Sequence, residues 1–320
     1  MQIQSIYPLF LEHPAVTTDS RNTPQGSIFF ALKGISFNGN KFARQAIERG
    51  CAYAFVDEPE YADNKSIFLV DNCLTTLQQL AGFHRKQFRG KIIGITGTNG
   101  KTTTKELIAA VLAQNYHVHC TQGNLNNHIG VPLTLLQLKA KHEIAVIEMG
   151  ANHPGEIKEL CEMVTPDYGL ITNVGKAHLE GFGSLEGVIR AKGELYDAVR
   201  KTSNTLFIRH ENNYLQQIAS GMTKVEYGVS PGLFVTGNLQ NDSLYMSFEW
   251  QSVDSHHQET GTHLVGGYNL ENALAAVAVG KFFGVDAADI NAAISSYIPQ
   301  NNRSQQKNTC RNSLIIDSYN

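Results

Sequence analysis

One segment constrains the fold of this chain more than any other: an apolar run feeds a glycine-rich turn in KIIGITGTNGKTTTKE, residues 91–106. Its first five residues have the character of a buried strand. The turn that follows is bounded by Gly97 and Gly100, and a helix is expected over 101–114. The common phosphate-binding pattern, G-x-x-x-x-G-K-[ST], requires a glycine at the position of Ile95, so the spacing here departs from it.

Phosphate binding nevertheless suits this turn. A strand that enters a helix through glycines directs backbone N–H groups and the positive end of the helix dipole toward one point. Lys101 would reach the terminal phosphates of a nucleotide, and the hydroxyl of Thr102 would hold Mg²⁺. The alternative is an ordinary glycine turn, but lysine is electrostatically misplaced at a helix N-terminus unless an anion balances it. The loop residues of the expected nucleotide site are Gly97, Thr98, Asn99, Gly100, Lys101, Thr102 and Thr103.

The length of 320 residues predicts two or three folded units. We expect a small α/β unit over residues 1–83, with strands at 27–32 and 52–56. Helices are expected at 41–50 and 74–88, the second leading into the next unit.

The second unit, residues 84–308, alternates strands and helices. Apolar strands are expected at 91–95, 143–150 and 168–174, and a helix over PGEIKELCEMV is expected to open at Pro154, which suits a first turn. This alternation predicts an α/β fold with a mostly parallel sheet flanked by helices.

Beyond residue 220 the apolar pattern changes to a period of two. In SLYMSFEW, residues 243–250, every second side chain is apolar, which predicts a small antiparallel patch with one buried face. Helices are expected at about 268–283 and 286–297. Residues 309–320 contain the start of a further strand.

The composition argues against several classes of protein. A net charge of −3 without long runs of one sign gives no reason to expect nucleic acid or an anionic membrane as a partner. No stretch approaches the roughly 20 apolar residues of a membrane span, and the N-terminus lacks a signal-peptide pattern. The five cysteines contain no C-x-x-C pair, which favours reduced thiols. These features predict a soluble, cytoplasmic protein.

Glu148 ends the apolar strand expected at 143–150. A carboxylate at the C-terminal end of a parallel strand lies where open α/β sheets bind ligands, so Glu148 would share the Mg²⁺ held by Thr102. The alternative is an exposed glutamate at a strand end, which is common.

Lys192 lies inside an apolar stripe of the helix expected over 185–200, together with Val188, Leu195 and Val199. Burial lowers the pKa of a lysine, and a neutral amine reacts with CO₂ to form a carbamate, an anionic oxygen ligand. Before any resemblance is considered, the pattern favours the alternative, a lysine whose stem packs while its ammonium reaches water.

The glycine loop resembles that of the Mur ligases, which join amino acids to the UDP-linked precursor of peptidoglycan. Further motifs follow in family order: TQGNLNNHIGVPLTLL (121–136), IEMGANHPGEI (147–157), NVGKAHLEGFGS (173–184), AKGELYD (191–197) and GYNLENALAA (267–276). The GNLNN and MGANHPGEI variants are most similar to those of the family member that adds D-alanyl-D-alanine to UDP-N-acetylmuramoyl-tripeptide.

The resemblance implies ATP and two Mg²⁺ ions as cofactors. Glu148, His178 and Lys192, carbamylated by CO₂, would hold the metals together with Thr102. The expected catalytic residues are Lys101, Glu148, His178 and Lys192. By itself, His178 is typical of an ordinary hydrogen-bonded histidine in a loop.

Further positions match the ATP-binding residues of the family. Asn269 and Asn272 would read the edge of adenine, although an asparagine near a helix start is also typical of a cap. Arg303 resembles the arginine that contacts ATP. Asp317 resembles the carboxylate that hydrogen-bonds the ribose.

The precursor is expected to bind the first unit. TTDSRNTPQGSIFFALKG, residues 17–34, resembles the UDP-binding strip, so Ser20 and Arg21 would contact the diphosphate; the alternative is a turn with a solvated arginine. Asn126 and Asn127 would hold the muramoyl-peptide side, or are ordinary loop residues. FNGNKF departs from the family pattern, so Asn38 and Asn40 receive no role.

The implied reaction is amide formation through an acyl phosphate, with UDP-N-acetylmuramoyl-tripeptide and D-alanyl-D-alanine as substrates. The protein is expected to be a monomer. The alternatives are the preceding ligase step, folylpolyglutamate synthase, or a nucleotide-binding fragment without turnover. Residues 309–320 are expected to begin a C-terminal ligase domain. We therefore expect little or no ligase activity from this polypeptide alone.

Overall fold

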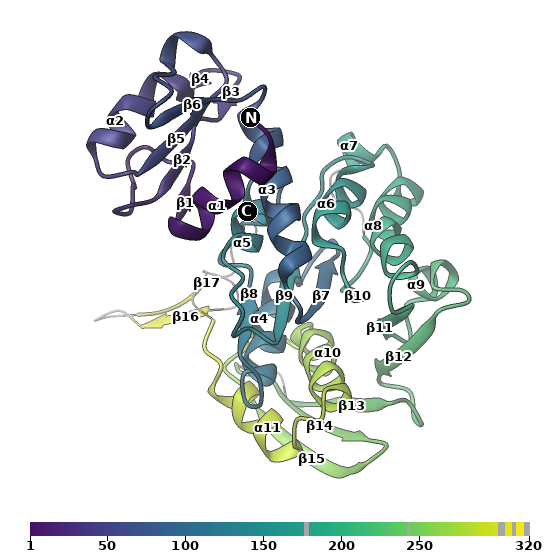
Figure 1. Ribbon diagram of the computed structural model, residues 1–320. Coiled ribbons are helices and arrows are strands. Elements are labelled where there is room, and N and C mark those ends of the chain that lie inside the picture. Colours follow the sequence, from purple (N-terminus) through teal and green to yellow (C-terminus); the bar gives the residue numbers. More distant parts are fainter. Residues whose placement is uncertain (176–178, 242–243, 300–304, 309–311, 317–320) are drawn as a thin grey trace. The chain divides into compact units, whose positions relative to one another are not determined.

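The computed structural model describes residues 1–175, 179–241, 244–299, 305–308 and 312–316. Its chain divides into two compact units (Figure 1). The first contains Met1–Arg89 and Asn127–Ala140, and the second contains Gly90–Asn126 and Lys141–Asn320. Segment 127–140, which was expected in the second unit, therefore belongs to the first. The functional division at 83 and 308 stays a prediction.

The first unit contains a four-stranded parallel sheet of order β1-β2-β5-β6. Its strands are β1 (Val16–Thr17), β2 (Ile28–Phe30), β5 (Tyr53–Val56) and β6 (Ile67–Leu69), and a separate hairpin pairs β3 (Lys33–Gly34) with β4 (Phe37–Asn38). The helices are α1 (Ile3–Glu12), α2 (Ala43–Glu48), α3 (Cys73–Gln87) and α5 (Gly130–Leu135), with 3₁₀ turns at Gly39–Phe42 and Pro59–Tyr61. The strands expected at 27–32 and 52–56 and the helix expected at 74–88 are confirmed, whereas the helix expected at 41–50 is a 3₁₀ turn followed by the shorter α2. The hairpin, α1, β1 and β6 were not expected.

Local chemistry explains where α3 begins. Asn72 has extended backbone angles, and its side-chain oxygen accepts a hydrogen bond from the backbone N–H of Thr75, which satisfies a helix donor that has no partner in the helix. Just beside this cap, the backbone N–H of Cys73 donates to Asp57 at 3.2 Å.

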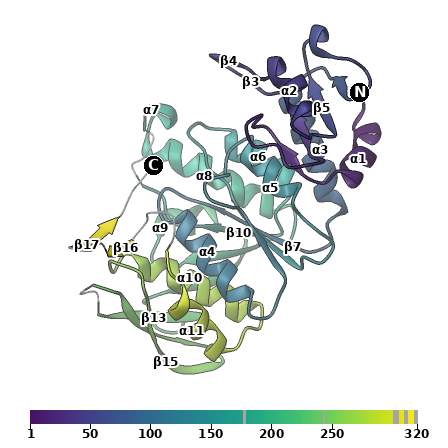
Figure 2. The same ribbon diagram turned by 90° about the vertical axis from the view of Figure 1, so that its left-hand side faces the viewer.

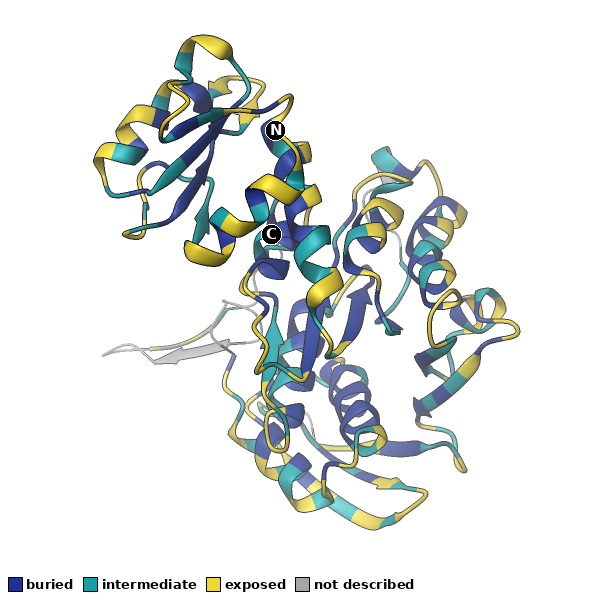
Figure 3. Cartoon of the chain, viewed as in Figure 1, coloured by how far each residue is buried: buried dark blue, intermediate teal, exposed yellow. Residues whose placement is uncertain are grey.

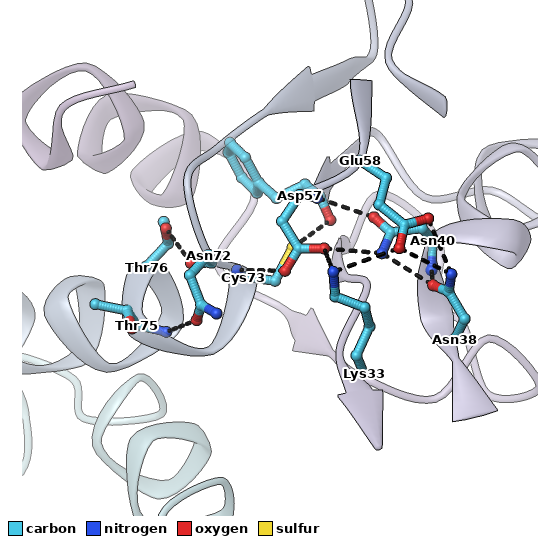
Figure 4. A network of polar contacts seen from close by, with 10 residues as sticks. Lys33, Asn38, Asn40, Asp57, Glu58, Asn72, Cys73, Thr75 and Thr76 are labelled. Atoms are coloured by element: carbon cyan, nitrogen blue, oxygen red, sulfur yellow. Dashed lines mark hydrogen bonds and ion pairs between the residues drawn. The ribbon is translucent and has the colours of Figure 1, made fainter. Parts of the chain in front are cut away.

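Asp57 lies at the centre of the polar network in Figure 4. Its carboxylate accepts from Asn40 at 2.9 Å and pairs with Lys33 at 3.0 Å, while Asn40 is fully buried. Asn38 donates to Glu58 and accepts from Asn40. The two asparagines that departed from the family pattern thus fasten the hairpin to the end of β5.

Replacing Asp57 with alanine is expected to lower the free energy of unfolding of the first unit by about 3 kcal/mol, because Lys33, Asn40 and Cys73 lose a shared buried acceptor. Urea denaturation followed by circular dichroism measures this. Glu60→Ala, in an exposed position of the 3₁₀ turn, is the matched control. Equal stability of the two variants would contradict the importance of the network.

The second unit is built on a nine-stranded sheet of order β15-β14-β13-β12-β11-β10-β7-β9-β8. Its strands are β7 (Lys91–Thr96), β8 (Val118–Cys120), β9 (Ile144–Glu148), β10 (Tyr168–Ile171), β11 (Thr205–Arg209), β12 (Thr223–Gly228), β13 (Val235–Asn241), β14 (Ser247–Ser252) and β15 (Ser255–Gly261). Pairing is parallel from β8 to β13 and antiparallel from β13 to β15, so a mostly parallel sheet with an antiparallel patch is confirmed.

Helices cover both faces of this sheet. They are α4 (Lys101–Leu112), α6 (Glu156–Val164), α7 (Leu179–Phe182), α8 (Leu185–Val199), α9 (Asn213–Ile218), α10 (Asn269–Phe282) and α11 (Ala287–Ser296); a hairpin of β16 (Gln305–Asn308) and β17 (Ser313–Ile316) follows. Helices α4 and α10 lie side by side (Figures 1 and 2) and share one core with Ile93 and Ile95 of β7. The intervening Gly94 faces Leu195 of α8, so α8 covers the opposite face.

Burial follows this arrangement. Helix α10 is buried along nearly its whole length, as its dark colour in Figure 3 shows. Its small alanine side chains allow close packing between α4 and the sheet. Among the helices of the described residues, none is long and apolar enough to cross a membrane.

Several expected boundaries differ from the structure: the strands expected at 143–150 and 168–174 end at Glu148 and Ile171, and the helix expected over 101–114 ends at Leu112. Helix α6 begins at Glu156 rather than at Pro154, because Gly155 adopts φ +90° as the N-cap. Strand β14 begins at Ser247, so Leu244 precedes it and is 39% exposed, whereas Phe248 and Trp250 are buried as expected.

Candidate functional site

The glycine loop connects β7 to α4 with the backbone geometry that the sequence predicts. Gly97 has φ +147° and Gly100, the N-cap of α4, has φ +76°. Both values lie in the region that favours glycine. A Cβ at Gly97 would lie 2.0 Å from Thr172 Oγ1, and one at Gly100 would lie 2.5 Å from Asn272 Oδ1. The loop therefore needs glycine at both positions.

Residues after β10 hold this loop in place. The backbone N–H of Thr98 donates to the carbonyl oxygen of Asn173 at 3.0 Å, and that of Asn99 donates to Asn173 Oδ1 at 2.9 Å. The hydroxyl of Thr172 donates to the carbonyl oxygen of Asn99 at 2.5 Å. No role was predicted for Thr172 or Asn173. Their only signal in the sequence was their place at the carboxyl end of a neighbouring parallel strand.

Lys101 folds back over the loop. Its Nζ donates to the carbonyl oxygens of Gly97 at 2.9 Å and of Thr98 at 3.0 Å. This places a positive charge beside the backbone of a glycine loop at a helix N-terminus, an arrangement that attracts an anion.

Thr102, Glu148 and Asn126 meet beside the loop. Glu148 Oε1 accepts from the hydroxyl of Thr102 at 3.3 Å and from Asn126 Nδ2 at 2.7 Å. Glu148 is 1% exposed, so the alternative of an exposed strand-end glutamate is wrong. Its Oε2 is buried and has no hydrogen-bond partner among the described residues.

An unpaired buried carboxylate oxygen next to a hydroxyl suits a hard cation such as Mg²⁺, which prefers oxygen ligands. The residues present therefore fit a metal between Thr102 and Glu148. Among the described residues, no three histidine, cysteine, aspartate or glutamate side chains converge on one point. Few protein ligands are usual for Mg²⁺ next to a nucleotide.

Lys192 is buried in α8, and its ammonium does not reach solvent. The residue is 3% exposed, its Nζ donates to the carbonyl oxygen of Ala151 at 3.4 Å, and it lies 5.4 Å from the centre of the Phe182 ring. Burial, together with the charge of Lys101, lowers the pKa of Lys192 to about 8. The apolar stripe is confirmed, and a lysine reaching water is excluded.

The two asparagines of α10 bind each other and α4. Asn272 Nδ2 donates to Asn269 Oδ1 at 2.9 Å, and Asn272 Oδ1 accepts from the hydroxyl of Thr104 at 2.9 Å. Asn269 Nδ2 donates to the carbonyl oxygen of Val265, and Tyr268 is the N-cap, so Asn269 does not cap the helix. Adenine recognition by this pair stays a prediction.

Family models match most of the chain. Residues 95–280 match the Mur ligase middle domain, and residues 14–85 match the Mur ligase family catalytic domain. The first match alone covers more than half of the chain. This chain belongs to the Mur ligase family.

Individual Mur ligases are similar over nearly the whole chain. The UDP-N-acetylmuramoyl-tripeptide–D-alanyl-D-alanine ligase of Bacillus subtilis is 38% identical over 95% of this chain and 66% of its own length. MurF from Acinetobacter baumannii has a TM-score of 0.84 at 30% identity, covering 96% of this chain and 68% of its own. MurF from Thermotoga maritima, solved in complex with ADP, has a TM-score of 0.81 at 28% identity, covering 96% and 71%. This Mur ligase chain thus spans about two thirds of its relatives' length.

The expected precursor contacts lie in different surroundings. Ser20 is buried and its carbonyl oxygen accepts from Arg49, while Arg21 is exposed and makes two 2.9 Å contacts with Asp19. Asn127 Oδ1 accepts from the backbone N–H groups at the start of α5, within the first unit. His178, Arg303 and Asp317 lie outside the described residues.

Proposed function

We propose that this chain provides the precursor-binding and ATP-binding units of a ligase that adds D-alanyl-D-alanine to UDP-N-acetylmuramoyl-tripeptide. The observation that carries the proposal is the buried Thr102–Glu148 pair beside a glycine loop that holds Lys101. The similarity to MurF proteins over nearly the whole chain supports the choice among Mur ligases.

The reaction makes a carboxylate into an acyl donor. The terminal carboxylate of the tripeptide attacks the γ-phosphorus of ATP, a carbon–oxygen–phosphorus link forms, and ADP leaves. The amine of D-alanyl-D-alanine then attacks the acyl carbon, the amide bond forms as phosphate leaves, and the amine gives up a proton. Phosphorylation is needed because oxide is a poor leaving group.

The loop residues bind and orient the phosphates. Backbone N–H groups at the start of α4 and the ammonium of Lys101 would face the charge that spreads over the transferring phosphoryl group. Without nucleotide, Lys101 Nζ donates to the carbonyl oxygens of Gly97 and Thr98. When ATP binds, Nζ would donate to phosphate oxygens instead. Asn269 and Asn272 would read adenine, and Arg303 and Asp317 would contact ATP.

Thr102 and Glu148 would hold Mg²⁺, which neutralises phosphate charge when bound. His178 and Lys192 would complete a second metal position, with Lys192 as a carbamate. A pKa of about 8 supports this role, because about a tenth of such a lysine is neutral at pH 7 and able to react with CO₂. Ser20, Arg21, Asn126 and Asn127 would hold the precursor.

Calorimetric titration with three ligands tests the proposal: UDP-N-acetylmuramoyl-tripeptide, the corresponding dipeptide and a folate substrate. We expect the tripeptide to bind at least about tenfold more tightly than the dipeptide. Only the tripeptide is long enough to bring its terminal carboxylate to the position where it would react. Equal or better binding of the dipeptide would support the preceding ligase step instead. Selective folate binding would support folylpolyglutamate synthase.

A further inference from the structure

Lys105 is a buried lysine that the mechanism above does not use. It lies on α4, one turn beyond the glycine loop, and is 1% exposed. Lysine is almost never fully buried unless its charge is paired. Its Nζ donates to the carbonyl oxygens of Thr121 at 2.7 Å and of Gly123 at 3.5 Å, and it pairs with Glu106 Oε1 at 3.5 Å. Two carbonyl oxygens and one carboxylate therefore surround the buried ammonium.

The two carbonyl oxygens belong to the segment that surrounds Glu148. Thr121 is fully buried directly after β8, and its Oγ1 accepts from the backbone N–H of Glu148 at 2.9 Å. Asn126, at the other end of the same segment, donates to Glu148 Oε1 at 2.7 Å. Lys105 thus holds a segment that contacts Glu148 through both its backbone and its carboxylate.

The partner of Lys105 is fixed as well. The hydroxyl of Tyr297, the C-cap of α11, donates to Glu106 Oε2 at 2.5 Å. Burial, together with the nearby Glu106 carboxylate, raises the pKa of Tyr297 well above its usual range, so this donor keeps its proton. Glu106 is therefore held where its second oxygen faces the ammonium of Lys105.

We propose that Lys105 and Thr121 are positioning residues for Glu148. The ammonium fixes the carbonyl oxygen of Thr121, the hydroxyl of Thr121 fixes the backbone of Glu148, and the carboxylate is thereby kept beside Thr102. Lys105 touches neither nucleotide nor metal in this role. The inference rests on the proposed nucleotide function, because it concerns the metal-binding side of that site.

The test compares ADP affinity with and without Mg²⁺ by calorimetry, in the unaltered chain and in two variants. Lys105→Met keeps the volume of the side chain and removes its charge, and Thr121→Val removes the hydroxyl alone. Mg²⁺ is expected to raise the affinity for ADP in the unaltered chain, and we expect this increase to be about tenfold smaller in each variant. Removing a residue that positions a metal ligand typically has an effect of this size. The metal-free affinity for ADP is expected to stay unchanged, because the glycine loop is intact.

Lys91→Met is the matched control, since Lys91 pairs with Asp167 at the surface of the same unit. It is expected to keep the full Mg²⁺-dependent gain. If Lys105→Met does not fold, Thr121→Val decides. A full gain in a folded Thr121→Val or Lys105→Met variant would overturn the proposal, as would an equal fall of both affinities, which marks a general structural role. Absence of ADP binding by the unaltered chain would instead overturn the proposed function.

Discussion

Replacing Gly97 with alanine is expected to lower the affinity for ADP on the order of 100-fold, because a displaced loop loses hydrogen bonds from its N–H groups to phosphate, worth about 1.5–3 kcal/mol each. The new Cβ would lie 2.0 Å from Thr172 Oγ1 and 3.0 Å from the backbone nitrogen of Thr172, at a φ of +147°. Thr172 cannot simply turn away, since its hydroxyl holds the carbonyl oxygen of Asn99 at 2.5 Å. The loop itself must therefore move.

Gly261→Ala is the control for this variant. Gly261 lies in β15 of the same unit, and a Cβ there would meet no atom within 4 Å. Calorimetry with ADP compares the two, and cooperative thermal unfolding shows that each is folded. An unchanged affinity in folded Gly97→Ala would mean that nucleotide binds away from this loop.

Replacing Lys192 with methionine is expected to stabilise the second unit by about 3 kcal/mol at pH 7 in CO₂-free buffer. The pKa of Lys192 falls from 10.5 to about 8 on folding, and each pKa unit corresponds to about 1.4 kcal/mol. Below pH 8 both states carry the proton, so the folded state bears the full cost. Between pH 8 and 10.5 the unfolded chain binds more protons than the folded one, so stability rises with pH.

The advantage of Lys192→Met is therefore expected to be constant below pH 8 and to vanish by about pH 10.5. Urea denaturation across this range measures it, with Lys201→Met, at an exposed position, as the control. An advantage that does not depend on pH would contradict the burial of a charge.

Carbamylation of Lys192 is tested separately by ¹³C NMR in the presence of ¹³C-bicarbonate. A carbamate resonance is expected in the unaltered chain and not in Lys192→Met.

Local patterns in the sequence were sufficient for much of the site. The strand, the two glycines and the helix at 91–112 follow from residue type alone, and the end of β9 placed Glu148 beside Thr102 because parallel strands end at one edge of a sheet. The apolar stripe of α8 was predicted as well, but by itself it favoured a Lys192 ammonium that reaches water, and the structure shows this lysine buried. These features depend on neighbours along the chain, or on a general rule of sheet topology.

Contacts between distant segments could not be predicted in this way. Asn173 binds a loop 74 residues earlier in the chain, and Thr104 binds Asn272 across 168 residues. Thr121 and Lys105 carry no pattern that marks them as partners of Glu148. Only the packing of α4, α10 and the sheet brings these residues together, so their hydrogen bonds had to be seen in the structure.

The most direct test of the central claim is a crystal structure of the chain with ADP and Mg²⁺. We expect the phosphates on the loop from Gly97 to Thr102, with Lys101 Nζ moved from the carbonyl oxygens of Gly97 and Thr98 to phosphate. An ion is expected in contact with Thr102 Oγ1 and Glu148. Nucleotide bound elsewhere, with Lys101 still on those carbonyl oxygens and no ion beside Glu148, would contradict the account.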